Sequence, residues 1–236
     1  MRLLDVGCGW GGMVLHAAAE HGVRAVGVTI SQRQADLAKK RAADLGLGDL
    51  VEVRLQDYRD VDDGPYDAIS SIGMFEHVGL EQLHSYFQHL QALLRPQGRL
   101  LNHAIGRPAR ASDRRSVPLP LSRRRKRTFI NRFVFPDGEL HEVGTIVSAM
   151  QQDGFEVRHL ESLREHYALT LRAWVANLEA SWDEAVRLTT EGRARVWRLY
   201  MAASAVGFEA GRIQVHQVLG TKADRGRSGL PLRPTF

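Results

Sequence analysis

Short apolar runs alternate with amphipathic stretches over the first half of the chain. The apolar runs have the length and composition of β-strands and cover about residues 2–6, 24–29, 51–55, 66–72 and 99–105. Between them, apolar residues recur with helical spacing at about 12–21, 31–45 and 80–94. Ser31 is placed to cap the second helix, with Gln34 at the capping-box position, and Gly46-Leu47-Gly48 ends it. This alternation predicts an α/β fold with a doubly wound, mostly parallel sheet that binds ligands at the carboxyl ends of its strands.

The second half of the chain is less regular. A Pro- and Arg-rich segment, 107–127, is expected to be an inserted loop. Beyond it we predict a helix at 143–152, a strand at 156–163, two helices within 165–206 and a strand near 213–219, which brings the sheet to seven strands. We expect one domain over residues 1–220, followed by a disordered tail at 221–236.

The composition is that of a globular protein with one core. Of the 236 residues, 44% are apolar, which is enough to bury one substantial core. The lone cysteine, Cys8, cannot form an internal disulfide, and the sequence has neither a signal-peptide pattern nor an apolar stretch of about 20 residues. We expect a cytoplasmic protein whose only membrane contact is peripheral, at the inner surface.

The net charge of +5 is concentrated between Arg107 and Arg132, a segment that includes Arg123-Arg124-Arg125-Lys126-Arg127. Near an anionic bilayer each such residue contributes on the order of 1 kcal/mol of attraction. A solvated loop explains the run equally well. Nucleic acid ranks third, because no aromatic residues alternate with these arginines to stack on bases, and we expect no such partner.

A glycine-rich turn follows the first predicted strand. Gly7, Gly9 and Gly12 fit the dinucleotide spacing G-x-G-x-x-G, but the second strand ends in Val28-Thr29-Ile30-Ser31-Gln32, without the acidic residue that a nicotinamide site requires. Asp5 followed by Gly7-x-Gly9-x-Gly11 is the arrangement of S-adenosylmethionine (SAM) methyltransferases, in which glycines let the backbone approach the cofactor. The candidate cofactor residues here are Asp5, Gly7, Gly9, Trp10, Gly11, Thr29, Ser31 and Gln32.

Asp57 and Tyr58 end the third predicted strand, where such enzymes contact the adenine. A carboxylate at this point can accept a hydrogen bond from the adenine amino group. Asp is also common at the start of loops without any functional role. The interpretation of Asp57 as an adenine ligand therefore depends on its position relative to the glycine turn.

A second cluster of motifs indicates a reaction site. Glu76 and His77 follow the fourth strand in the segment Gly73-Met74-Phe75-Glu76-His77-Val78-Gly79, at the sheet edge where the cofactor is expected. Taken alone, the pair is typical of a helix start with a packed histidine. It is joined, in chain order, by Asn102-His103-Ala104-Ile105-Gly106, by Phe135-Pro136-Asp137-Gly138-Glu139-Leu140, by His166-Tyr167 before Thr170-Leu171-Arg172-Ala173-Trp174, and by Gly207-Phe208-Glu209-Ala210.

These collinear motifs resemble the cyclopropane-fatty-acid and mycolic-acid cyclopropane synthase family, from Leu3 to about Leu219. The resemblance implies that the alkene of an unsaturated acyl chain attacks the SAM methyl group, and that the resulting carbocation loses a proton to a bound bicarbonate. It implies that the bicarbonate is held by Cys8, Glu76, His103, Ile105 and Tyr167. Cys8 and Ile105 would contribute mainly backbone groups, Glu76 a shared proton, and His103 and Tyr167 hydrogen-bond donors.

The same cation can instead give a methylene branch, which a partner reductase would turn into a methyl group, and the spacing of residues does not decide between the two products. The Arg-rich insertion and Leu140-His141-Glu142-Val143 look closer to the methyl-branching relatives. We expect the acyl carrier to be a phospholipid, because of the basic run. A metal site is not expected, because His103, His141, His159 and His166 lack compact ligand spacing.

The family also carries a helical region before the first strand, which here begins beside Met1. We therefore expect the isolated chain to bind SAM poorly, since an open site admits water. Two other functions stay open at this point: methyl transfer to a small molecule or nucleic acid, with Glu76 or His103 as a general base, and a truncated, inactive family member.

Overall fold

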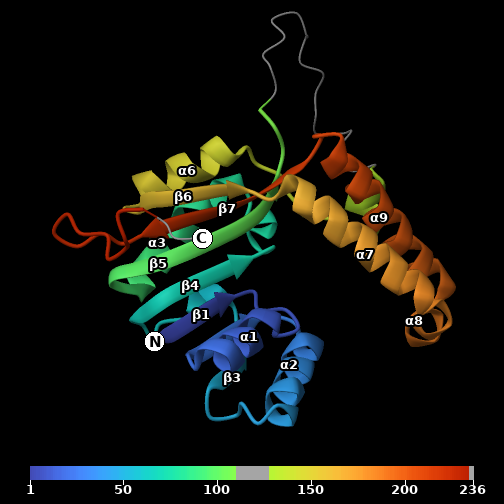
Figure 1. The fold of residues 1–236 in the computed structure, drawn as a ribbon, viewed down its shortest axis with the longest axis horizontal. Helices are drawn as coiled ribbons and strands as arrows, with labels where there is room; N and C mark the ends of the chain where they lie inside the picture. Colours follow the sequence, from blue (N-terminus) through green and yellow to red (C-terminus); the bar gives the residue numbers. More distant parts are fainter. Residues whose placement is uncertain (110–127, 234–236) are drawn as a thin grey trace, which may run out of the picture. The chain divides into compact units, whose positions relative to one another are not determined.

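A seven-stranded sheet with strand order β3-β2-β1-β4-β5-β7-β6 organises the chain (Figure 1). The structure is a computed structural model that describes residues 1–109 and 128–233. The strands are β1 (Arg2–Val6), β2 (Arg24–Thr29), β3 (Val51–Leu55), β4 (Tyr66–Ile72), β5 (Leu94–Gly106), β6 (Glu156–Ser162) and β7 (Gln214–Thr221). From β3 to β5 neighbouring strands pair in parallel. Backbone hydrogen bonds join Lys222, just after β7, to Gln97 and Gly98 near the start of β5, so β7 runs antiparallel to β5. The predicted mostly parallel fold is confirmed.

The helices are α1 (Gly12–His21), α2 (Gln32–Asp44), α3 (Leu83–Leu93), α5 (Phe129–Phe133), α6 (Val143–Gln152), α7 (Arg164–Ala180), α8 (Trp182–Leu188) and α9 (Glu191–Glu209). Three short 3₁₀ turns, η1 (Tyr58–Asp60), η2 (Phe75–His77) and η3 (Leu80–Gln82), complete the elements used below. The predicted helix 80–94 was too long, because its first turn is η3 and Leu94 already pairs with Tyr66 as part of β5. The two helices predicted within 165–206 are three, because Thr190 caps a new helix.

The chain divides into two compact units. The first comprises Met1–Ala104, Gly144–Glu161 and Gln217–Phe236, and the second comprises Ile105–Val143 and Ser162–His216. The sequence-based boundaries of one domain over 1–220 and of an insertion at 107–127 stay predictions, and residues 110–127, which hold the basic run, lie outside the described residues. Part of the predicted tail is described, and there Lys222 Nζ donates to the carbonyl oxygens of Gln91 and Leu94.

In the first unit, helices cover both faces of the sheet because strand residues alternate between them. On one face, Leu3 and Ala25 form a buried cluster with Val14 of α1 and Ala38 of α2. On the other face, Tyr86 of α3 donates to Ser71 of β4. The glycine turn follows β1 on this scaffold, at the carboxyl edge of the parallel strands.

In the second unit, α7 and α9 lie side by side (Figure 1). Their contact is an apolar cluster that contains Leu171, Met201 and Phe208 and that includes Val215 of β7. At its edge Arg172 makes a bidentate ion pair with Glu209. Among the described residues, no helix is long and apolar enough to cross a membrane.

Candidate cofactor and reaction site

The turn after β1 is built from glycines in a left-handed conformation, with φ of 74° at Gly7, 53° at Gly9 and 84° at Gly11. Side chains rarely adopt these angles. A Cβ on Gly11 would lie 2.9 Å from Cβ of Ala38 in α2, so the turn also packs closely on its neighbours. Trp10, half exposed between these glycines, is held through its carbonyl oxygen, which accepts a hydrogen bond of 3.1 Å from Arg41.

The glycine turn and the segment after β4 meet at Met74. A Cβ on Gly7 would lie 2.7 Å from Cγ of Met74, so only glycine allows this approach. Met74 directly precedes η2, where Glu76 is buried and His77 is exposed. The contact therefore brings the two motifs that the sequence analysis singled out, the cofactor turn and the Glu76 segment, to one place in the fold.

Cys8 directs its thiol into the core. A Cβ on Gly27 of β2 would lie 2.9 Å from the Cys8 sulfur, which shows how closely the thiol approaches that strand. Burial, and then the nearby Asp5 carboxyl, raises the pKa of Cys8 to about 12, so the thiol is neutral and a poor nucleophile. Its backbone N–H donates to Val28.

Asp5 is buried within the sheet, where its carboxylate accepts a hydrogen bond of 2.7 Å from the Ser70 hydroxyl of β4. Burial outweighs this hydrogen bond and raises the pKa of Asp5 to about 6. Asp5 thus joins β1 to β4 inside the sheet, two residues before Gly7.

At the carboxyl end of β2, Thr29 connects the strand to α2. Its hydroxyl donates to Gln34 Oε1 at 2.8 Å and accepts from the Ser31 backbone N–H. Ser31 caps α2 as predicted, since its side chain accepts from the Gln34 N–H. The reciprocal half of a capping box is not formed, because the Gln34 side chain binds Thr29 instead. Gln32 is exposed and donates to Asp36.

Asp57 and Tyr58 lie at the carboxyl end of β3. The Asp57 side chain caps η1 and forms an ion pair with the exposed Arg59, which lowers the pKa of Asp57. Tyr58 packs edge-on against Tyr86, with ring centroids 5.5 Å apart.

His103 lies near the end of β5, half-buried, next to two fixed partners. Its backbone oxygen accepts from Gly73 N–H, which ties β5 to the segment leading to Glu76. Its ring Nδ1 is 3.3 Å from Nε2 of Gln217 in β7. Burial lowers the pKa of His103, so the imidazole is neutral.

Ile105 and Tyr167 belong to the second unit, in the apolar cluster between α7 and α9. The Tyr167 ring packs edge-on against Phe208 at 5.0 Å and against Trp174 at 6.0 Å. The structure thus groups Cys8, Glu76 and His103 in one unit and Ile105 and Tyr167 in the other.

A family model described as mycolic acid cyclopropane synthetase matches residues 1–218. The chain belongs to this family. It is 50% identical over 234 residues to a probable fatty acid methyltransferase, Rv3720, of Mycobacterium tuberculosis, covering 99% of this chain and 52% of that protein. It is 36% identical over 219 residues to the cyclopropane-fatty-acyl-phospholipid synthase of Escherichia coli K12, covering 93% of this chain and 53% of that protein.

Among solved structures, the mycolic acid cyclopropane synthase CmaA1 complexed with SAH and CTAB has a TM-score of 0.82 and 33% identity, covering 93% of this chain and 77% of that one. The chain spans about half the length of the curated relatives that it matches.

The turn of this cyclopropane synthetase family member fits SAM on its own geometry. The packing of Gly7 and Gly11 accounts for the absence of their side chains, but a Cβ on Gly9 would meet no atom closer than 4.0 Å. Gly9 therefore leaves open space beside the turn, with the Gly7 carbonyl oxygen as its nearest neighbour. At the carboxyl end of the neighbouring strand β2, Thr29 is hydrogen-bonded to Gln34 of α2.

Two residues of the candidate site carry little signal in the sequence. Gln34 was interpreted only as a capping residue, although its spacing from Thr29 along the start of α2 is compatible with their contact. Gln217 carried no signal, because its contact with His103 joins residues 114 positions apart.

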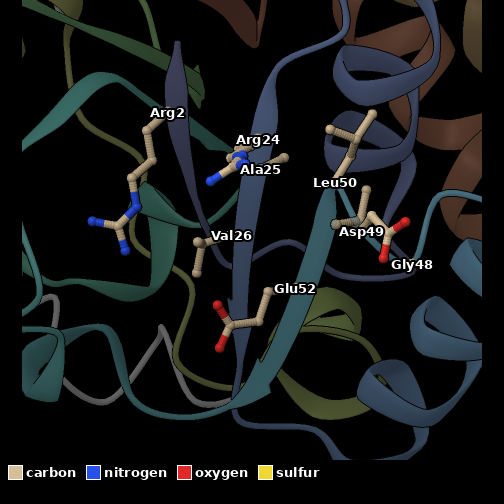
Figure 2. A pocket seen from close by; sticks show the side chains of 9 residues that line it. Arg2, Arg24, Ala25, Val26, Gly48, Asp49, Leu50 and Glu52 are labelled. Carbon is tan, nitrogen blue, oxygen red and sulfur yellow. The ribbon is translucent and has the colours of Figure 1, made fainter.

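A pocket of about 350 Å³ lies at the opposite edge of the sheet, at the amino ends of β1, β2 and β3 (Figure 2). Arg2, Arg24, Asp49 and Glu52 give it mixed charge. Parallel sheets bind their ligands at the carboxyl edge, so we assign no role in the reaction to this pocket.

Proposed function

We propose that this chain transfers the methyl group of SAM to the double bond of an unsaturated acyl chain. The proposal rests mainly on the close contact between Met74 and Gly7. In this member of the cyclopropane synthetase family, that contact brings the segment with the buried Glu76 to the proposed cofactor turn. A neutral alkene is a weak nucleophile, so its rate depends on alignment with the methyl group and on the exclusion of water.

The residues proposed to hold SAM lie at three neighbouring strand ends. The turn from Gly7 to Gly11 would contact the methionine part through its backbone. Thr29 and Gln34 would hold the ribose hydroxyls, with the Gln34 amide N–H₂ as donor. Asp57 would accept a hydrogen bond from the adenine amino group. Loosening its ion pair with Arg59 would cost little free energy, because Arg59 is exposed to solvent. SAM supplies the electrophilic methyl group.

The proposed base for the carbocation is bicarbonate. Glu76 would share a proton with it, the neutral His103 and the Tyr167 hydroxyl would donate hydrogen bonds, and the backbone at Cys8 and Ile105 would complete the site. The proposal requires Tyr167 and Ile105 of the second unit to reach Glu76 and His103 of the first. The buried thiol of Cys8 is consistent with a backbone role for that residue.

The product is either a cyclopropane ring or a methylene branch for a partner reductase, and the proposed acyl carrier is a phospholipid. Peripheral contact with an anionic membrane surface would depend on the basic run within 110–127, which lies outside the described residues.

The test is an assay of the chain with methyl-deuterated SAM at high concentration and vesicles of a monounsaturated phospholipid. Either proposed product loses one deuterium from the transferred methyl group, because the cation is quenched by proton loss. Proton NMR of the product made with unlabelled SAM then separates a cyclopropane ring from a methylene branch. A methyl group that keeps all its deuterium on a nitrogen or oxygen acceptor would contradict the proposal and favour the small-molecule acceptor.

Glu76→Gln tests the site itself. We expect a loss of turnover of at least about 100-fold, with binding of S-adenosylhomocysteine unchanged, because the substitution removes the carboxyl group that holds the proposed bicarbonate base. His77→Gln is the matched control, since the exposed neighbour should leave turnover unaltered. Equal effects of the two substitutions would count against a catalytic role for Glu76.

A further inference from the structure

Gln217 and His103 form a pair across the sheet that the proposed reaction does not yet use. Gln217 lies on β7 and His103 on β5, neighbouring strands, and both residues are half-buried. Nε2 of Gln217 is 3.3 Å from Nδ1 of His103. Both residues belong to the first unit, so the contact is internal to it.

The chemistry of this contact determines which imidazole nitrogen carries hydrogen. An amide nitrogen is only a donor, so the Nδ1 atom that faces Gln217 must be the acceptor. In a neutral imidazole one nitrogen accepts and the other donates. Nε2 of His103 is then the N–H group. Burial keeps the ring neutral by lowering the pKa of His103, so the choice between the two neutral tautomers is a real one.

We propose that Gln217 is a positioning residue that holds His103 in the tautomer with hydrogen on Nε2. The proposal rests on the proposed function in one respect, that His103 serves the reaction as a hydrogen-bond donor. The backbone of His103 is already held by Gly73 N–H, so the Gln217 contact governs the ring and its proton rather than the strand.

A glutamine suits this task better than a carboxylate. A carboxylate at position 217 would accept from Nδ1–H, which moves the hydrogen away from Nε2 and favours the charged imidazolium. An anion bound at Nε2 would then lose its donor whenever the ring is neutral. The neutral amide fixes the donor without adding charge beside the reaction.

The experiment measures the tautomer directly, by NMR of the chain with ¹⁵N-labelled histidine, and turnover separately. His103→Gln assigns the His103 signals. Gln217→Leu removes the donor, and Gln217→Glu replaces it with an acceptor of nearly the same shape. Gln214→Leu is the matched control, since Gln214 is three residues earlier on the same strand and its side chain points to the opposite face.

In the unaltered chain we expect Nδ1 of His103 to be unprotonated and Nε2 protonated. We expect a mixture of tautomers in Gln217→Leu, hydrogen on Nδ1 in Gln217→Glu, and the original signature in Gln214→Leu. Turnover should fall about tenfold in Gln217→Leu, as for the loss of one oriented hydrogen bond, and further in Gln217→Glu. The KM for SAM should not change.

Hydrogen on Nδ1 in the unaltered chain, or an unchanged signature in both Gln217 variants, overturns the inference whatever the activity. Expected signatures accompanied by no methyl transfer to any acyl chain support the role of Gln217 on the ring and overturn the proposed function instead. Circular dichroism spectra and thermal melts of the two variants exclude a folding defect as the cause.

Discussion

The buried Asp5 carboxyl should make this protein less stable as the pH rises. Burial raises its pKa from 3.8 to about 6 in the folded chain. A carboxyl with a higher pKa when folded binds more protons in the folded than in the unfolded state, so the free energy of unfolding falls between these two pH values. The shift is about 2 units at 1.36 kcal/mol each, which corresponds to a loss of about 3 kcal/mol above pH 6.

Asp5→Asn removes this loss. The Asn side-chain oxygen still accepts from the Ser70 hydroxyl, but the group no longer ionises. At about pH 8 we expect the variant to be more stable by about 3 kcal/mol, or by roughly 6 to 12 °C in Tm for a chain of this size. At about pH 3, below both pKa values, the two proteins should be nearly equally stable, because the Asp5 carboxyl is then mostly protonated in both states.

Urea denaturation followed by circular dichroism at both pH values measures the difference. Asp63→Asn serves as a control of opposite sign. Asp63 accepts hydrogen bonds from Arg54 and Tyr66, and the pKa of Asp63 lies well below its usual range, so its substitution should destabilise the chain at about pH 8. An Asp5→Asn variant no more stable than the parent at pH 8 would refute the reasoning, because the ionised carboxylate would then be stabilised within the sheet.

Two further substitutions test other groups of the fold. Asn102 is fully buried on β5, and neither polar atom of its amide has a hydrogen-bond partner among the described residues. Asn102→Leu should therefore raise the free energy of unfolding, measured by urea denaturation, by about 1 kcal/mol. A decrease of that size would instead indicate a bound internal water. Gln34→Ala should raise the Kd for S-adenosylhomocysteine about tenfold in calorimetry, as for one lost hydrogen bond, whereas Gln151→Ala, at an exposed glutamine of α6, should not; equal effects would show that Gln34 does not hold the cofactor.

The parallel part of the fold was predictable because its signals are local. The predicted strands at 2–6, 24–29, 51–55 and 66–72 coincide with β1 to β4, and α1 and α6 also have their predicted bounds. Each of these strands is a short apolar run bounded by turn residues, and parallel strands buried on both faces read this way. The boundary at β5 failed for a long-range reason, since Leu94 extends as a strand only because Tyr66 pairs with it.

At the candidate site, the backbone conformation was predictable from the glycines, whereas the contacts between side chains were not. The left-handed conformations of Gly7, Gly9 and Gly11 follow from glycine being the residue that adopts them freely. The direction of a side chain such as that of Gln34 depends on which of several possible hydrogen-bond partners it binds. Gln34 was expected to reach the Ser31 N–H, but the Thr29 hydroxyl captures both groups.

Gly7 shows how one residue joins the two halves of the proposed chemistry. Its φ of 74° alone would explain a glycine, as it does at Gly9, but the two positions differ in what surrounds them. At Gly9 the missing side chain leaves open space, whereas at Gly7 it leaves space for Met74. Because Met74 directly precedes η2, any displacement of the turn at Gly7 also displaces the helix that carries Glu76. The contact between Gly7 and Met74 therefore couples the position of the proposed cofactor turn to the position of Glu76, the proposed proton-handling group.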